Sequence, residues 1–245
     1  MSERPSWQWD ETRQVGTDYA DVAEVERYEK RMGEFRDLPA EDAAILETLA
    51  LPDRSHILEI GTGTGHFARA AARAGHRVTA LDTSPAMLRY AEDRAKSEGL
   101  TGIEFRLAGF LTFRAATGSF DAAVSVAVLH HLPDLWKAVA LHNIHRVLKP
   151  GGQFLLRDVV FSSKDRDPGS QFTTFVDAMP EAMRENAVNH IAREFSTFDW
   201  IMEGLLTQAC FAIQHVVDSQ APLVEYLVKT VGVAPTSQVD CWTVT

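Results

Sequence analysis

The 245-residue sequence contains only two cysteines, Cys210 and Cys241, and no long apolar run. The cysteines show no metal-ligand spacing, so we expect them to stay reduced. No stretch approaches the roughly 18 apolar residues that a membrane span needs. The polar opening, residues 1–5, has no signal-peptide core. We therefore predict a cytoplasmic protein with no membrane partner.

The chain also lacks a run of basic residues. Asp and Glu together number 34 and Lys and Arg 24, which gives a formal net charge of −10. Such a protein repels a phosphate backbone unless a basic patch is segregated on one face, so nucleic acid is not expected as a partner. A hydrophobic content of 45% fits one globular domain with a sizeable core. We expect a monomer or a homodimer.

Three alternate glycines, Gly61, Gly63 and Gly65, follow a short apolar run at residues 56–60 and precede an Ala-rich helical pattern. This order predicts a strand, a tight loop and a helix. Glycines let the backbone approach a ligand closely, and the helix start offers free N–H groups. A dinucleotide fingerprint needs its third glycine three places after the second, where this chain has His66. NAD and NADP are therefore not expected to bind.

A second strand is predicted over residues 77–82. It ends in Asp82, about twenty residues beyond the first glycine of the loop, the offset at which a carboxylate meets a ribose diol in nucleotide-binding sheets. We therefore predict that Asp82 is a ribose ligand.

The run from Leu58 to Gly65 and the acid at Asp82 resemble the first two motifs of the class I S-adenosylmethionine-dependent methyltransferases. The resemblance implies S-adenosyl-L-methionine as cofactor, with the glycine loop on the methionine part and Met87 near the adenine. An inactive or nucleotide-binding Rossmann-like domain with ordinary turn glycines is the alternative. The cofactor-binding residues that the resemblance implies are Glu59, Gly61, Thr62, Gly63, Gly65, Asp82, Thr83, Met87, Gly109, Phe110 and Val126.

The chain departs from this family after its third predicted strand, residues 103–107. Many relatives carry an acid there that accepts a hydrogen bond from the adenine amino group. Counting back from Phe120 and Asp121 puts Gly109 at that place. We therefore expect backbone groups of residues 108–111 to take over the adenine contact.

A near-continuous apolar run, residues 120–128, is typical of a central parallel strand that is covered on both faces. The sequence after it, from Leu129 to Asp134, resembles the fourth-strand motif of the family and includes His130 and His131. An imidazole with a pKa of about 6.5 can serve as a general base, so both are candidate catalytic residues. The alternative is that they shape the loop or pack. Weaker candidates of the same kind are Asp158, His190 and Glu194.

The second half of the chain completes the predicted sheet. A helix over residues 134–148 should bury Leu135, Val139, Ile144 and Leu148 and stop before the breaker cluster at 150–152. A fifth strand follows over residues 153–158, and a terminal hairpin is predicted from residues 211–217 and 222–228. The family resemblance implies an α/β doubly wound, seven-stranded, mostly parallel sheet in the order 3-2-1-4-5-7-6, with the last strand antiparallel.

Ligands of open parallel sheets bind beyond the carboxyl ends of the strands. One pocket mouth is therefore expected to gather the residues at five strand ends, which are Gly61, Asp82, Gly109, His130 and Asp158.

The chain is predicted to have three parts. Residues 1–50 form an amino-terminal arm and cap helices, residues 51–230 the methyltransferase domain, and residues 231–245 a tail. Residues 161–194 form a helical insertion at the position where the family usually builds a substrate lid. The predicted substrate-binding residues are Tyr19, His130, Asp158, Phe172 and Phe175.

The resemblance does not by itself specify whether a metal ion is bound or which molecule accepts the methyl group. Catechol-type methyltransferases of this fold use a divalent cation near the fourth and fifth strands, where only Asp134 and Asp158 stand here. That is too few oxygen ligands, so we predict no metal. We predict a methyltransferase that acts on a small or medium-sized organic molecule, at an O, N or C atom that the sequence does not specify. An RNA methyltransferase and a cofactor-binding regulatory protein without transfer activity are the alternatives.

Overall fold

The computed structural model describes residues 5–13, 25, 33, 36–164, 167–218 and 223–232. Tyr19, a predicted substrate-binding residue, and the predicted tail beyond residue 232, with Cys241, lie outside the described residues. Among the described helices, none combines the length and the apolar character that crossing a lipid bilayer requires.

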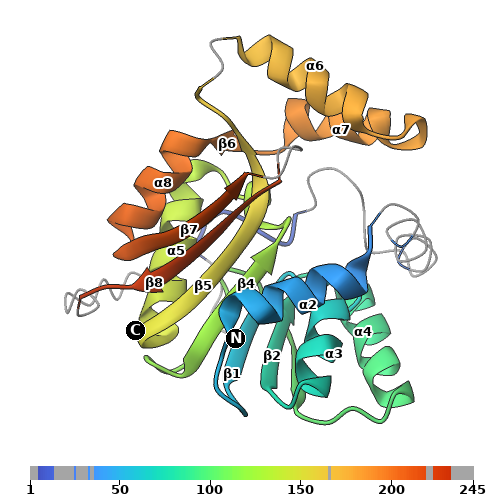
Figure 1. Ribbon diagram of the computed structural model, residues 1–245, viewed down its shortest axis with the longest axis vertical. Helices are drawn as coiled ribbons and strands as arrows, with labels where there is room; N and C mark the ends of the chain where they lie inside the picture. The colour runs from blue at the N-terminus through green and yellow to red at the C-terminus, as the bar shows by residue number, and fades with distance from the viewer. Residues whose placement is uncertain are drawn as a thin grey trace.

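One sheet runs through the molecule (Figure 1). Its strand order is β3-β2-β1-β4-β5-β8-β7, and a two-residue strand, β6, pairs with the end of β5. The strands β3, β2, β1, β4 and β5 are parallel to one another, whereas β8 runs antiparallel to β5 and to β7. This is the predicted order, once the short β6 is left out of the count. The strands span His56–Ile60 (β1), Arg77–Asp82 (β2), Ile103–Leu107 (β3), Phe120–Val126 (β4), Leu148–Phe161 (β5), Thr197–Phe198 (β6), Phe211–Asp218 (β7) and Leu223–Thr230 (β8).

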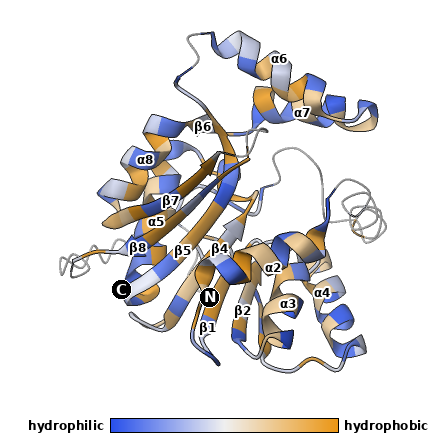
Figure 2. Cartoon of the chain, in the orientation of Figure 1, coloured by the Kyte–Doolittle hydropathy of each residue, from blue (hydrophilic) through white to orange (hydrophobic). Residues whose placement is uncertain are grey.

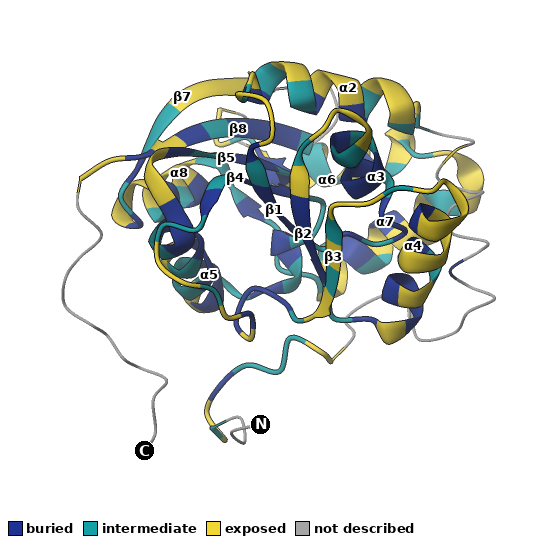
Figure 3. Cartoon of the chain, turned by 90° about the horizontal axis from the view of Figure 1, so that it is seen from below, coloured by how far each residue is buried: buried dark blue, intermediate teal, exposed yellow. Residues whose placement is uncertain are grey.

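Helices cover both faces of this sheet. Alternate residues of β1 point to opposite faces: Leu58 and Ile60 join the core beneath α5 and α8, whereas Ile57 joins the core beneath α2 and α3. The central strands β1, β2 and β4 are largely apolar and buried, whereas the edge strands β3 and β7 are largely exposed (Figures 2 and 3). The helices span Leu38–Leu49 (α2), His66–Arg73 (α3), Pro85–Ser97 (α4), Asp134–Val147 (α5), Pro168–Ala178 (α6), Glu181–Arg193 (α7) and Asp199–Gln208 (α8), and a 3-10 turn, η1, covers Leu129–His131.

Local sequence explains where α4 begins. Ser84 is its N-cap, and its hydroxyl accepts a hydrogen bond from the backbone N–H of Met87 at 3.2 Å. Pro85, which has no N–H to lose, takes the first helical position. The start of α4 is therefore fixed directly after Asp82, the residue that ends β2.

Two predictions about α5 and β5 are wrong. Leu135 was expected in the core but is 71% exposed, because the buried face of α5 carries Trp136, Ala140 and Ile144 at helical spacing. The predicted breaker cluster at residues 150–152 does end the helix, yet it lies inside β5, which begins at Leu148. A register shift of the β4–β5 pairing between Phe120 and Ala122 accommodates this irregular start.

The insertion after β5 forms two helices. Its helical pattern is broken after Met179, where Pro180 precedes the first residue of α7. The helices α6 and α7 lie together beyond the end of β5, away from α2, α3 and α4 (Figure 1). An apolar cluster joins this pair to β5 through Phe175 and Ala187 on the helices and Val159 and Phe161 on the strand.

Candidate active site

The glycine loop folds back on the end of β2. The N–H groups of Gly61 and Thr62 both donate to the carbonyl of Leu81 at 2.8 Å. Gly61 has a φ of 79°, and a Cβ atom there would lie 2.2 Å from Val128 Cγ2. A side chain at this position would therefore be strained in its backbone and would collide with the segment after β4. Glycine keeps the space between β1 and β4 open.

Asp82 holds the loop from the other side. Its Oδ2 accepts from the N–H of Gly63 and its Oδ1 from the N–H of Ser84, both at 2.8 Å. Burial raises the pKa of Asp82, and these backbone hydrogen bonds oppose that shift. The carboxylate is thus fixed at the mouth of the loop with lone pairs still available on both oxygens.

A pocket opens at the carboxyl ends of β1, β2, β3 and β4. Of the five strand-end residues expected around one mouth, Gly61, Asp82 and Gly109 line it, whereas His130 and Asp158 do not. His131 lines it in place of His130. The lining residues are Glu11, Arg13, Ile60, Gly61, Gly63, Asp82, Thr83, Ser84, Met87, Ala108, Gly109, Phe110, Val126, Ala127, Val128, His131 and Leu132.

Glu11 of the amino-terminal arm brings a carboxylate to the place beside Gly109. It accepts from the N–H of Leu111 at 3.0 Å and from Thr112 Oγ1 at 2.7 Å. A Cβ atom on Gly109 would lie 2.4 Å from Glu11 Oε2, so the missing side chain makes room for this carboxylate. Burial raises the pKa of Glu11, and hydrogen bonds from Thr112 and Leu111 oppose the shift. Sequence analysis missed Glu11; the absence of an acid at Gly109 was the only signal.

Two aromatic residues that precede Glu11 anchor the arm. Trp7 stacks on Trp136 of α5 with ring centroids 6.5 Å apart, and Trp9 meets Phe195 edge to face at 5.5 Å. Such pairs contribute about 0.5 to 1.5 kcal/mol each beyond the area they bury. Residues 5–13 therefore form part of the pocket wall.

The two neighbouring histidines have different environments. His130 is buried, and its Nδ1 lies 2.5 Å from Asp158 Oδ1. Burial lowers the pKa of His130, but the charges of Asp158 and Glu194 outweigh it, so the net shift is upward. Among the described residues none makes such a hydrogen bond to the ring of His131, and burial together with the charge of His130 lowers the pKa of His131 to about 4. The histidine in the pocket is therefore neutral at pH 7, and His130, whose pKa is raised, lies behind it.

Comparisons with known proteins agree with this geometry. Residues 57–152 match the family model described as a methyltransferase domain. An uncharacterized methyltransferase of Oceanobacillus iheyensis is 31% identical over 121 residues, which are 49% of this chain and 54% of that protein. The chain thus spans about half the length of that relative. Another, from Geobacillus kaustophilus, is 25% identical over 78% of this chain and 98% of its own length.

The matched methyltransferase domain, the relatives and the strand order together support a class I S-adenosylmethionine-dependent methyltransferase. They likewise support S-adenosyl-L-methionine as the cofactor and methyl transfer as the reaction. A solved S-adenosylmethionine-dependent methyltransferase from Aquifex aeolicus has the same fold, with a TM-score of 0.63 at 18% identity over 86% of this chain and 99% of that one.

Three of the predicted cofactor residues of this methyltransferase lie behind the pocket wall. Glu59 is buried and accepts from Thr62 Oγ1 at 2.7 Å, and burial raises its pKa to about 8. Gly65 is packed against α4, where a Cβ atom would lie 2.7 Å from that of Ala91. These residues shape the loop from behind, whereas eight of the predicted residues line the pocket: Gly61, Gly63, Asp82, Thr83, Met87, Gly109, Phe110 and Val126.

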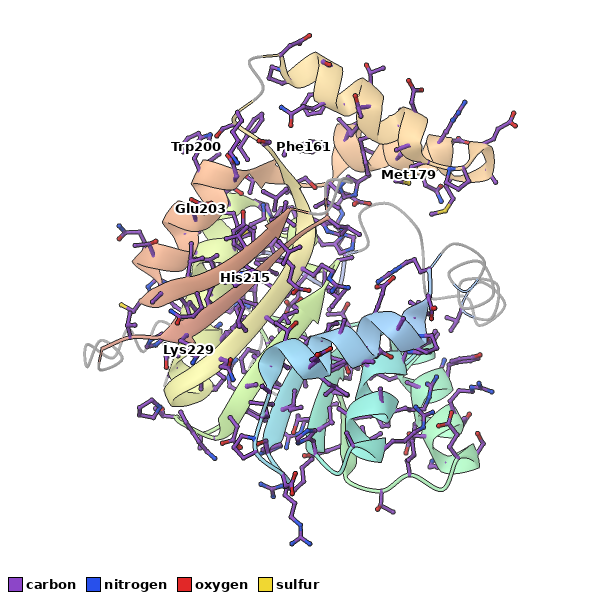
Figure 4. The ribbon with its side chains drawn as sticks, in the orientation of Figure 1. Phe161, Met179, Trp200, Glu203, His215 and Lys229 are labelled. Carbon is purple, nitrogen blue, oxygen red and sulfur yellow. The ribbon has the colours of Figure 1, made fainter. Side chains whose placement is uncertain are left out.

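The predicted substrate-binding aromatics of the methyltransferase pack on β5. Phe172 and Phe175 both meet Phe161 edge to face, with ring centroids 4.9 Å and 6.1 Å apart. Phe161 lies near the end of β5, below α6, and Met179 at the junction of α6 and α7 (Figure 4). The described pocket contains none of the residues from 171 to 194 in its lining.

Proposed function

We propose that this methyltransferase acts on a small or medium-sized organic acceptor. The observation that carries the proposal is the arm: Glu11 and Arg13 complete the pocket wall, and Trp7 and Trp9 fasten the arm to the domain. A pocket that the chain's own arm covers suits an acceptor that can enter it whole. The formal net charge of −10 also disfavours RNA.

The cofactor fits the pocket residues by their chemistry. Gly61 and Gly63 offer close backbone approach, and Asp82 offers carboxylate lone pairs to a ribose diol. Met87 and Phe110 offer apolar contact on the adenine side. When bound, the cofactor supplies an electrophilic methyl group, and the main contribution of the chain is to hold the acceptor atom in line with it.

His131 is the histidine that we propose to contact the acceptor. Its lowered pKa makes it a poor proton carrier at neutral pH but leaves a neutral ring nitrogen that can orient a hydroxyl or an amine. We propose in addition that residues 171–194 close over the acceptor together with the arm. The backbone N–H of Phe195 donates to the carbonyl of His130 at 2.8 Å, so the end of α7 is tied to the segment next to His131.

A panel of small hydroxylated, phenolic and amine acceptors tests this function through release of S-adenosylhomocysteine. We expect turnover with at least one small-molecule class and none with RNA. Turnover of RNA together with salt-dependent RNA binding would contradict the proposal in favour of an RNA enzyme. Tight cofactor binding without release from either class would favour a regulatory protein.

We predict that Glu11 accepts a hydrogen bond from the adenine amino group, in place of the acid that relatives carry where this chain has Gly109. Glu11→Ala should weaken S-adenosylhomocysteine binding by about 1.5 to 3 kcal/mol, the scale for one lost hydrogen bond to a charged group. Isothermal titration calorimetry measures the change. Asp10→Asn is the control, because the Asp10 carboxylate bonds to Thr12 within the arm. Equal affinities of Glu11→Ala and the unmutated protein would rule the contact out.

A further inference from the structure

Two histidines and a carboxylate meet beside the cofactor pocket, where the end of α7 packs against η1. The three are His130, His190 and Glu194, and one ligand atom from each lies within 4.8 Å of the others. His130 Nε2 is 3.3 Å from Glu194 Oε2, and His190 Nδ1 makes a short contact with the same oxygen. Donors bound to one zinc ion at about 2.0 to 2.2 Å lie roughly 3 to 3.5 Å apart, so only small adjustments separate this arrangement from a coordination shell.

The outward nitrogen of each histidine already has a partner. Asp158 Oδ1 lies 2.5 Å from His130 Nδ1, and Ser196 Oγ lies 2.6 Å from His190 Nε2. Metal-binding histidines are usually oriented in this way, by a hydrogen bond from the nitrogen that does not bind the metal. Both rings are thus held with the other nitrogen, Nε2 of His130 and Nδ1 of His190, directed towards Glu194.

The backbone around the cluster is fixed as well. His190 and Glu194 are one helical turn apart, and Phe195 is hydrogen-bonded through its N–H to the carbonyl of His130. Lys137 donates to the carbonyl of Phe195 and to Asp134 Oδ1, so the nearby lysine is paired with its own carboxylate. The two segments that supply the ligands are therefore joined before any ion binds.

The charges around the cluster also favour a bound cation. Asp158 and Glu194 bring two negative charges into a site where the side chains of His130 and Glu194 are only 7% and 10% exposed. Buried carboxylates need compensating positive charge, which protons on the paired histidines contribute in the metal-free protein. One divalent cation bound to neutral imidazoles would displace those protons and balance both carboxylates.

We propose that His130, His190 and Glu194 bind one divalent transition metal ion, zinc or a metal with the same ligand preference. Two imidazoles and one carboxylate select such ions, whereas Mg²⁺ prefers oxygen ligands. From the sequence we predicted no metal, because only oxygen ligands near the fourth and fifth strands were considered. The ion would connect α7 to His130, whose chain neighbour His131 lines the pocket.

Zinc titration of the EDTA-treated, desalted protein, without cofactor, tests the proposal by calorimetry. We expect one ion per chain, a higher Tm with Zn²⁺, and no effect of Mg²⁺. Glu194→Gln and His190→Ala should each weaken binding by about 100-fold or more, and Ser196→Ala by about 10-fold, as for residues that orient a ligand. Because cofactor is absent from the titration, its outcome is independent of the proposed acceptor.

Matched controls are Glu203→Gln on α8 and His215→Ala on β7, two exposed residues that are not members of the cluster; both are labelled in Figure 4. Neither should change the zinc affinity. The thermal unfolding of each variant shows that it is folded, and the unmutated protein loaded with Co²⁺ should give the visible absorption of nitrogen and oxygen ligation. Absence of stoichiometric binding, or affinity unchanged in both Glu194→Gln and His190→Ala, would overturn the proposal and leave the cluster as an ion-pair network.

Discussion

Asp82→Ala is expected to weaken S-adenosylmethionine binding by about 2 to 3 kcal/mol while the protein stays folded. We predict that its carboxylate bonds to the ribose hydroxyls, and each hydrogen bond to a charged group contributes about 1.5 to 3 kcal/mol. The same carboxylate holds the N–H groups of Gly63 and Ser84. Its loss therefore frees the glycine loop as well as removing a ligand contact, which places the effect at the upper part of that scale.

Calorimetry with S-adenosylhomocysteine measures this change. Asp121→Ala is a matched control, because Asp121 also accepts from a backbone N–H, that of His56 at 2.8 Å, but lies outside the pocket lining. The control should bind with unchanged affinity. An Asp82→Ala protein that binds as tightly as the unmutated one would remove Asp82 from the cofactor site.

Asp158→Ala should destabilise the metal-free protein by about 3 to 5 kcal/mol, the cost of removing one partner of a buried ion pair. Asp158 accepts from the ring and the backbone N–H of His130 and from the N–H of Val159. With the carboxylate gone, buried His130 loses its closer partner and keeps the longer contact with Glu194 Oε2 at 3.3 Å. Urea unfolding in EDTA measures the loss. Glu104→Ala, which breaks an exposed pair with Arg106, should cost at most about 1 kcal/mol.

The pair also predicts how this loss depends on pH. Burial raises the pKa of Asp158, but the charge of His130 outweighs it and the net shift is downward; the pKa of His130 is shifted upward. The contribution of Asp158 is present above its unfolded pKa and is lost as pH falls through the folded one. The contribution of His130 is present below its unfolded pKa and is lost as pH rises through the folded one. The difference between the two proteins should be largest between about pH 4 and 6.5. A difference that grows steadily above pH 8 would contradict this assignment.

Short-range signals predicted the sheet well. Apolar runs that end in Gly61 and Asp82, and the Ser84 and Pro85 start of α4, depend on residues adjacent in the chain, and the structure has these elements at the predicted places. The buried face of α5 was harder to predict, because Leu135 and Trp136 are both apolar. Periodicity alone does not decide which of two neighbouring residues faces the core.

Long-range contacts around the site could not be predicted. Glu11 reaches Leu111 across 100 residues, and His190 and Glu194 meet His130 only because α7 ends beside η1. No local pattern encodes such a meeting, since it depends on how the elements pack. The glycine loop could therefore be predicted from the sequence, whereas the position of Glu11 beside Gly109 could not.

The docking of the arm has a consequence for the order of folding during synthesis. The ribosome releases Glu11 long before Leu111 and Trp136, the residues against which the arm packs. Until those residues emerge, the arm has no surface to bind, and closing so long a loop is slow compared with forming local contacts. The arm should therefore dock last, after β4 and α5 have formed, so that the adenine side of the pocket is completed only on a nearly finished domain. A bulky fusion partner directly before residue 5 would then impair cofactor binding while leaving the sheet to fold as before.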